Sequence, residues 1–212
     1  MKLFGVIFEL SGVLYLYIDS VTVLAKIATR VTLMGSLRKG LKDSGRRGTS
    51  GGTGLVFSWN ELLFSESKIL TYKRYILVEG KLIHEGIDVS FLLVHAPSCS
   101  QERFDLWRDV MNLKKSISMP LMMFGDFQEV LEPEEIIGNE VTSQGMKDFQ
   151  HCIFTWYDYE NKHASRVDRV FVDQEWLEHF KVLKLRGLER SVADHRPLLV
   201  QSGLVEDIKS TC

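Results

Sequence analysis

The chain has 212 residues, of which 45% are hydrophobic and 25% are charged, and its formal net charge is −2. This length favours a single domain with a sizeable buried core, and the composition excludes a disordered or membrane-embedded chain. A net charge so close to zero gives no global electrostatic argument for nucleic-acid binding. The three cysteines lack the spacing of a metal site and fit a reducing compartment.

Residues 3–18 form an apolar run that suits neither a membrane span nor a signal peptide. Glu9 interrupts the run, no small-residue cleavage site follows it closely, and a membrane span needs about 18 residues. We therefore expect an intracellular protein, nuclear or cytoplasmic, that is not secreted and has no membrane partner. Across residues 1–34, the many β-branched side chains suit one or two strands followed by a short helix.

Residues 37–54 change in composition to Gly, Ser, Thr, Lys and Arg, which is typical of a loop or a flexible linker. No Gly-Lys-Ser/Thr sequence follows the glycines, so this segment is not a phosphate-binding loop. Its basic residues belong either to a solvated loop, which is the more common case, or to a nucleic-acid-binding patch. The candidates for that patch are Lys42, Arg46 and Arg47.

The main domain is predicted at residues 51–203, between a divergent N-terminal segment with its linker (1–50) and a short tail (204–212). Apolar runs bounded by polar turns predict strands at residues 55–59, 67–70, 75–78, 89–94, 121–124, 170–172 and 198–200. Helical spacing predicts helices at residues 101–117, 146–152 and 174–180. Many strands with few helices, and no strict alternation of the two, favour a sheet sandwich with helices outside.

Carboxylates stand where three of the buried strands begin or end. Asp126 follows one apolar strand, Asp168 precedes a second, and the Asp194-His195 pair precedes a third. Strand ends and the loops beside them are where a rigid scaffold usually carries its functional residues. The three positions together therefore predict a hydrolytic site.

The geometry of an extended backbone predicts which carboxylate orients the histidine. Neighbouring side chains on a strand point to opposite faces, so Asp194 cannot hold the ring of His195. Asp168, from another strand, is the candidate to fix the tautomer and ring plane of a histidine that contacts a scissile phosphate or relays a proton. Asp126 and Asp194 are candidates for holding a divalent metal such as Mg²⁺, or for positioning an attacking water.

Three motifs carry a resemblance to a known group: Gly125-Asp126-Phe127, Arg166-Val167-Asp168-Arg169 and Ala193-Asp194-His195. They are similar to late motifs of the endonuclease/exonuclease/phosphatase superfamily, the deoxyribonuclease-I-like fold. The nearest resemblance is to the endonuclease domain of plant LINE-type retrotransposons, over about residues 50–201. It implies an α/β (α+β) fold, a four-layer sandwich of two mainly antiparallel sheets flanked by helices. It also implies Mg²⁺- or Mn²⁺-dependent hydrolysis of phosphoesters, with DNA as the partner.

The resemblance implies a role for each of four residues. Asp126 matches the aspartate near the attacking water, and Asp194 matches a metal-site or water-positioning aspartate. His195 matches the phosphate-contacting histidine, and Asp168 matches the carboxylate that orients it.

The chain also departs from the family pattern. Residues 1–50 show neither the strand with a metal-site asparagine nor the strand that ends in a metal-ligand glutamate, so one sheet lacks strands unless residues 3–33 supply them. Gln128 stands where the family has asparagine, and misplacing that amide can cost about a hundredfold in rate. His95 stands where a tyrosine usually precedes Ala-Pro. Both residues remain catalytic candidates.

These departures leave three functions open on one fold. The first is a Mg²⁺-dependent endonuclease-like domain of retrotransposon origin whose activity is weak or lost. The second is a non-catalytic nucleic-acid-binding or interaction domain, and the third is a phosphatase of the same superfamily. The missing glutamate and Gln128 bear against efficient catalysis, and the sequence indicates no protein partner.

Overall fold

The computed structural model describes residues 13–18, 21–28, 41–46, 54–129, 136–137, 154–158, 160, 163–180, 183–188 and 195–202. The helix expected at residues 146–152 and the tail at 204–212 lie outside the described residues. Within the described part of the chain, no helix is both long enough and apolar enough to cross a membrane.

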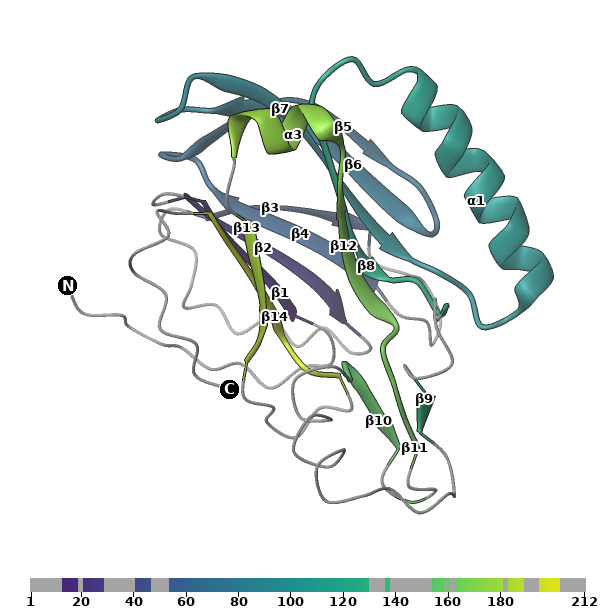
Figure 1. The fold of residues 1–212 in the computed structure, drawn as a ribbon. Coiled ribbons are helices and arrows are strands. Elements are labelled where there is room, and N and C mark those ends of the chain that lie inside the picture. The colour runs from purple at the N-terminus through teal and green to yellow at the C-terminus, as the bar shows by residue number, and fades with distance from the viewer. Residues whose placement is uncertain are drawn as a thin grey trace.

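Two packed sheets form the body of the molecule (Figure 1). The five-stranded sheet has the order β12-β8-β7-β6-β5, with β5 at Phe64–Thr71, β6 at Tyr75–Leu82, β7 at Ile87–His95, β8 at Leu121–Asp126 and β12 at Asp168–Val172. The six-stranded sheet has the order β13-β14-β1-β2-β4-β3, with β1 at Val13–Ile18, β2 at Val21–Ala28, β3 at Leu41–Arg46, β4 at Gly54–Asn60, β13 at Leu183–Gly187 and β14 at Leu198–Ser202.

A small third sheet, ordered β10-β11-β9, projects from one end of the two large sheets (Figure 1). It contains β9 (Ile136–Ile137), β10 (Trp156–Asp158) and β11 (His163–Ser165). Among the described strands, the pairs β1–β14 and β7–β8 are parallel and the remaining pairs are antiparallel. The prediction of a sandwich of mainly antiparallel sheets is therefore confirmed.

The N-terminal segment supplies strands to the six-stranded sheet. β1 and β2 lie between β14 and β4, so residues 13–28 do supply two strands to this sheet. The loop predicted for residues 41–46 is wrong, because these residues form β3 and pair with β4. Lysine, serine and glycine suggest a loop by composition, but an outermost strand with one unpaired edge tolerates them.

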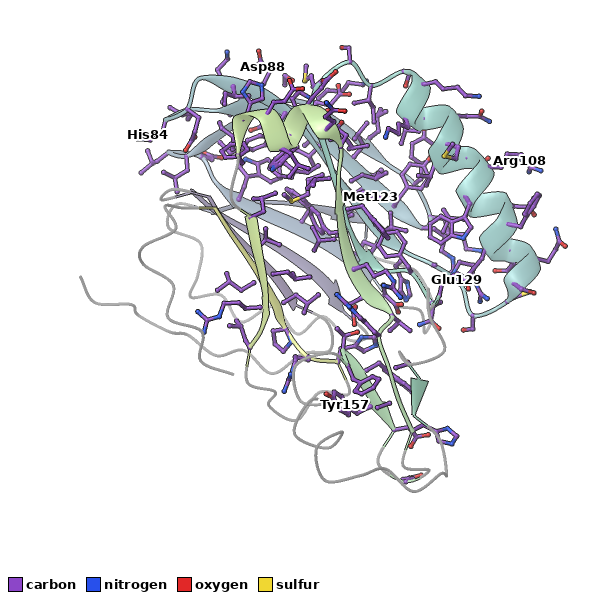
Figure 2. All side chains as sticks on the ribbon, in the orientation of Figure 1. His84, Asp88, Arg108, Met123, Glu129 and Tyr157 are labelled. Atoms are coloured by element: carbon purple, nitrogen blue, oxygen red, sulfur yellow. The ribbon has the colours of Figure 1, made fainter. Side chains whose placement is uncertain are left out.

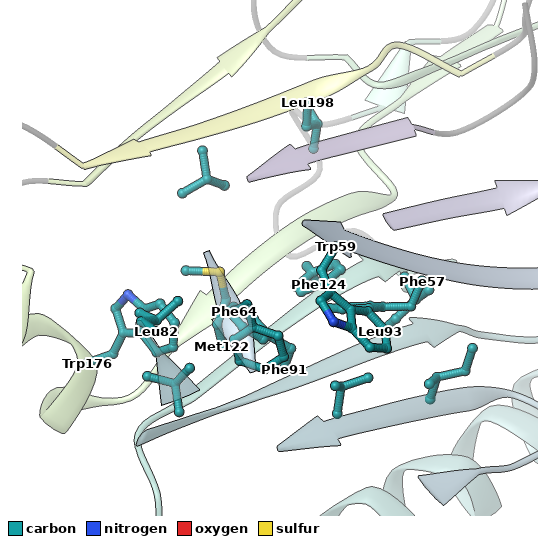
Figure 3. Packing of buried hydrophobic residues seen from close by; sticks show 14 of the residues in the cluster. Phe57, Trp59, Phe64, Leu82, Phe91, Leu93, Met122, Phe124, Trp176 and Leu198 are labelled. Atoms are coloured by element: carbon teal, nitrogen blue, oxygen red, sulfur yellow. The ribbon is translucent and has the colours of Figure 1, made fainter. Parts of the chain in front are cut away.

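Aromatic side chains fill the space between the two large sheets (Figure 3). Strand β4 alternates, so Leu55, Phe57 and Trp59 all face this core. The ring of Phe91 on β7 lies at its centre, with ring centroids at 5.9 Å from Phe57, 5.4 Å from Phe64 and 5.5 Å from Trp176. Aromatic pairs at these distances bury large areas and hold β7 in place between its neighbours.

Two helices were predicted correctly within a few residues. Helix α1 (Ser100–Lys115) covers the outer face of the five-stranded sheet through the buried Leu106 and Val110 (Figure 1). Helix α3 (Gln174–His179) begins at Asp173, whose side chain accepts hydrogen bonds from the backbone N–H of Trp176 and of Leu121, both at 2.9 Å. This one carboxylate therefore caps α3 and ties it to the start of β8.

Gly125 on β8 is paired with Val94 on the neighbouring strand β7. Its φ is 134°, which side-chain-bearing residues rarely adopt, and an added Cβ would collide with the backbone carbonyl of Val94. We expect Gly125→Ala to lower the free energy of unfolding by about 3 kcal/mol, measured by urea denaturation.

Gly86→Ala is the matched control. Gly86 also has a positive φ, 71°, but no atom lies within 4 Å of an added Cβ. Its replacement should cost about 1 kcal/mol, from backbone strain alone. Equal losses in the two variants would contradict a close approach at Gly125.

Candidate active site

Three neighbouring strands of the five-stranded sheet have ends that lie side by side. β7 ends at His95, β8 ends at Asp126 and β12 begins at Asp168. The parallel register pairs His95 with Asp126, and the antiparallel register pairs Asp126 with Asp168. Because directly paired residues point to the same face of a sheet, the three side chains form a row on the face that packs against the six-stranded sheet.

His195 reaches this row from the other sheet, just before β14. Its Nδ1 atom lies 2.8 Å from Oδ2 of Asp168, and both side chains are largely buried. The hydrogen bond predicted from the sequence is therefore present. A carboxylate oxygen accepts a hydrogen bond, so Nδ1 of His195 donates in this contact, and the contact fixes the plane of the imidazole ring.

Asp126 is buried, and Gln128 holds its carboxylate. The backbone N–H of Gln128 donates to Oδ1 at 2.9 Å, and its side-chain Nε2 donates to Oδ2 at 2.7 Å. Burial, and then the negative charge of Asp168, raise the pKa of Asp126 to about 6, although Gln128 and His195 act in the opposite direction. Gln128 has a φ of 50°, a left-handed conformation that this residue type seldom adopts.

His95 is neutral at physiological pH. Burial, followed by the nearby positive charge of Arg74, lowers the pKa of His95 to about 4. Its Nε2 atom lies 3.9 Å from Oδ2 of Asp126, yet the two groups are not charged together over most of the pH range. Sequence reasoning missed Arg74, whose carbonyl accepts the backbone N–H of His95 at 2.9 Å. The signal available was the basic turn between two predicted strands.

Charged side chains hold the loop that follows Asp126. Arg103 on α1 donates from Nε to Oε1 of Glu129 at 2.6 Å and from Nη1 to the carbonyls of Pro97 and Ser98. The buried Arg169 donates from Nε and Nη2 to the carbonyl of Glu129, both at 3.3 Å. Glu129 therefore lies between α1 and β12, beside the site (Figure 2).

The described residues do not fit a metal ion. Among them, no group of three or more His, Cys, Asp or Glu side chains converges as a metal site would require. Of the two metal-ligand candidates, Asp126 already accepts from Gln128 through both oxygens. Asp194 lies outside the described residues.

The residues predicted to bind nucleic acid are distant in sequence from His95, Asp126 and Asp168. Lys42 and Arg46 belong to β3 at one edge of the six-stranded sheet, where the structure describes the backbone. Arg47 lies outside the described residues. The basic patch therefore stays a prediction.

Comparison with known proteins identifies the fold. No family model and no curated protein match the sequence. The endonuclease domain of TRAS1, a telomere-specific non-LTR retrotransposon, is similar with a TM-score of 0.53 at 12% identity, over 79% of this chain and 82% of that chain. A mannosyl-6-phosphatase of Bacteroides thetaiotaomicron is similar with a TM-score of 0.49 at 14% identity, over 78% of each chain. TDP2 of D. rerio, complexed with single-strand DNA product, has a TM-score of 0.48 at 17% identity, over 74% of each chain.

The shifted pKa values of Asp126 and His95 make the free energy of unfolding depend on pH in opposite ways. The folded state favours a neutral Asp126, so this group lowers stability as the pH rises from about 4 to about 6. The folded state also favours a neutral His95, so that group raises stability from about pH 4 to pH 6.5. Without metal, we expect the stability of Asp126→Asn relative to wild type to increase by on the order of 2 kcal/mol between pH 4 and pH 7.

Urea denaturation in EDTA at a series of pH values measures this difference. The variant His95→Gln provides the control of opposite sign, because its stability relative to wild type should fall over the same range. Stability curves of wild type and Asp126→Asn that run parallel would contradict a raised pKa at Asp126.

Proposed function

We propose that this chain, which has the fold of the endonuclease/exonuclease/phosphatase (deoxyribonuclease-I-like) superfamily, is an endonuclease-like domain of retrotransposon origin that hydrolyses DNA phosphodiesters weakly. The observation that carries the proposal is the 2.8 Å contact between His195 and Asp168, beside a buried Asp126. The likeness to the endonuclease domain of a non-LTR retrotransposon supports the choice of nucleic acid.

The side chains of His195, Asp168 and Asp126 suit the hydrolysis of a phosphodiester. With its Nδ1 proton held by Asp168, His195 directs Nε2 at a phosphate oxygen, where a protonated ring donates a hydrogen bond. Asp168 stabilises the positive charge of that protonated ring. A carboxyl with a pKa of about 6 is suited to a general base near neutral pH, so Asp126 accepts a proton from the attacking water.

Two features make the activity weak. The side-chain amide of Gln128 donates to Asp126, so this amide is not directed at a substrate oxygen. A carboxylate has about four acceptor positions, and Gln128 fills two of those on Asp126. The described donors also do not assemble the oxygen-rich set that Mg²⁺ prefers.

The same contacts favour a second candidate, a non-catalytic nucleic-acid-binding domain. An Asp126 held by Gln128 is a poorer base, whereas His195 still offers a donor to a phosphate. Binding without turnover would show itself as salt-sensitive retention of DNA. The third candidate, a phosphatase, predicts hydrolysis of a phosphomonoester in place of plasmid nicking.

Nicking of supercoiled plasmid, in Mg²⁺, Mn²⁺ or EDTA, tests the proposal. We expect slow nicking by the wild-type chain, and about a hundredfold less by His195→Ala, because a positioned acid–base group contributes about 10²–10⁴-fold. The matched control is His84→Ala, since His84 is an exposed histidine in the turn between β6 and β7, far from Glu129 and the site (Figure 2).

Each outcome decides between the candidates. Equal nicking by wild type and His195→Ala would contradict the proposed role of the histidine. DNA retention without nicking would leave the binding domain, and hydrolysis of p-nitrophenyl phosphate alone would leave the phosphatase. Loss of nicking in EDTA would show that groups beyond the described residues complete a metal site.

A further inference from the structure

A single buried threonine contacts both chain segments that carry the histidine and its carboxylate. Thr155 precedes β10 and is only 3% exposed. Its side-chain Oγ1 accepts two hydrogen bonds, from the backbone N–H of Val167 at 3.1 Å and from that of Asp168 at 2.9 Å. The hydroxyl therefore fixes the backbone at the point where β12 begins.

The backbone of the same residue holds the segment of His195. The carbonyl of Thr155 accepts the N–H of Arg196 at 2.6 Å, and the next residue, Trp156, forms an antiparallel bridge with His195. The N–H of Thr155 donates to the carbonyl of Ser165 at 3.1 Å. One residue thus links two segments that lie 27 positions apart in sequence and that meet at the His195–Asp168 contact.

Two physical arguments give this link a functional consequence. A hydroxyl oxygen has two lone pairs, and the N–H groups of Val167 and Asp168 use both. Removing the oxygen leaves two buried donors unsatisfied, so the backbone must shift to find other partners. A shift of about half an ångström at Asp168 is enough to lengthen its 2.8 Å contact with Nδ1 beyond the usual hydrogen-bond distance.

We propose that Thr155 is the positioning residue of the His195–Asp168 pair, through the two N–H groups that its hydroxyl accepts. The proposal rests on the proposed function only for its catalytic consequence. The contact between His195 and Asp168 is a property of the folded chain and is measured without any turnover. A purely structural threonine would change stability and leave that contact as it is.

The first test is the proton NMR signal of His195 Nδ1–H, which the hydrogen bond to Asp168 shifts to low field and protects from exchange. We expect this signal in the wild type and in Thr155→Ser, which keeps the hydroxyl. Thr155→Val has the same shape without the hydroxyl and should lose the signal. Ser90→Ala is the control, because Ser90 is a buried hydroxyl that has no hydrogen-bond partner among the described residues.

The second test is the rate of plasmid nicking at saturating DNA. We expect Thr155→Val to lower kcat about 10- to 100-fold, as small misplacements of catalytic groups do, with KM nearly unchanged. Thr155→Ser should recover most of the rate, and Ser90→Ala should match the wild type. If neither the wild type nor any variant nicks the plasmid, the proposed function fails. The NMR signal still decides the role of Thr155.

A well-folded Thr155→Val that keeps the low-field signal would overturn the proposal. Should this variant not fold, hydrogen exchange of the wild-type chain provides the decision. The amide protons of Val167 and Asp168 must then exchange slowly, because their acceptor is buried. Exchange of these two amides at the rate of exposed ones would equally overturn the proposal.

Discussion

The register of three strands is the constraint on which the candidate site depends. The pairing of β7 with β8, and of β8 with β12, sets His95, Asp126 and Asp168 side by side on one face. A slip of one residue in either pair would turn a side chain to the opposite face of the sheet. The aromatic core around Phe91 opposes such a slip, since it would also expose large apolar rings. Packing thus maintains an arrangement of polar groups that is unfavourable in itself.

Placing Asp126 and Asp168 side by side in a buried position costs free energy because of electrostatics. Two carboxyl groups stand directly opposite each other in a buried position, and the negative charge of Asp168 disfavours the charged form of Asp126. The chain limits this cost with partners for both, since His195 contacts Asp168 and Gln128 donates twice to Asp126. His95 stays neutral at physiological pH, so it adds no positive charge beside the two carboxyl groups. The raised pKa of Asp126 is the part of the cost that remains.

Sequence reasoning succeeded where local pattern and tertiary structure agree. Apolar runs that end on Asp126 or begin after Asp168 are strands, and Asp168, the candidate from another strand once strand geometry had set Asp194 aside, does contact His195. It failed where the signal is non-local. The polar composition of residues 41–46 predicts a loop, but an edge strand also tolerates polar residues. Nothing in the composition shows that β4 lies beside them. The contact of Gln128 with Asp126 depends on a left-handed backbone that no motif indicated.

The parallel pairing of β1 with β14 has a consequence for biosynthesis. These strands come from opposite ends of the described chain, and Leu14 is paired with Leu198. The six-stranded sheet therefore cannot close until residues 198–202 have been translated and have left the ribosome, and contacts between residues so far apart in sequence form slowly. His195 lies three residues before the start of β14, so the site is assembled only when this strand docks. A nascent chain in which β14 has not yet emerged from the ribosome thus lacks the assembled His195–Asp168 pair that is proposed to act on nucleic acid.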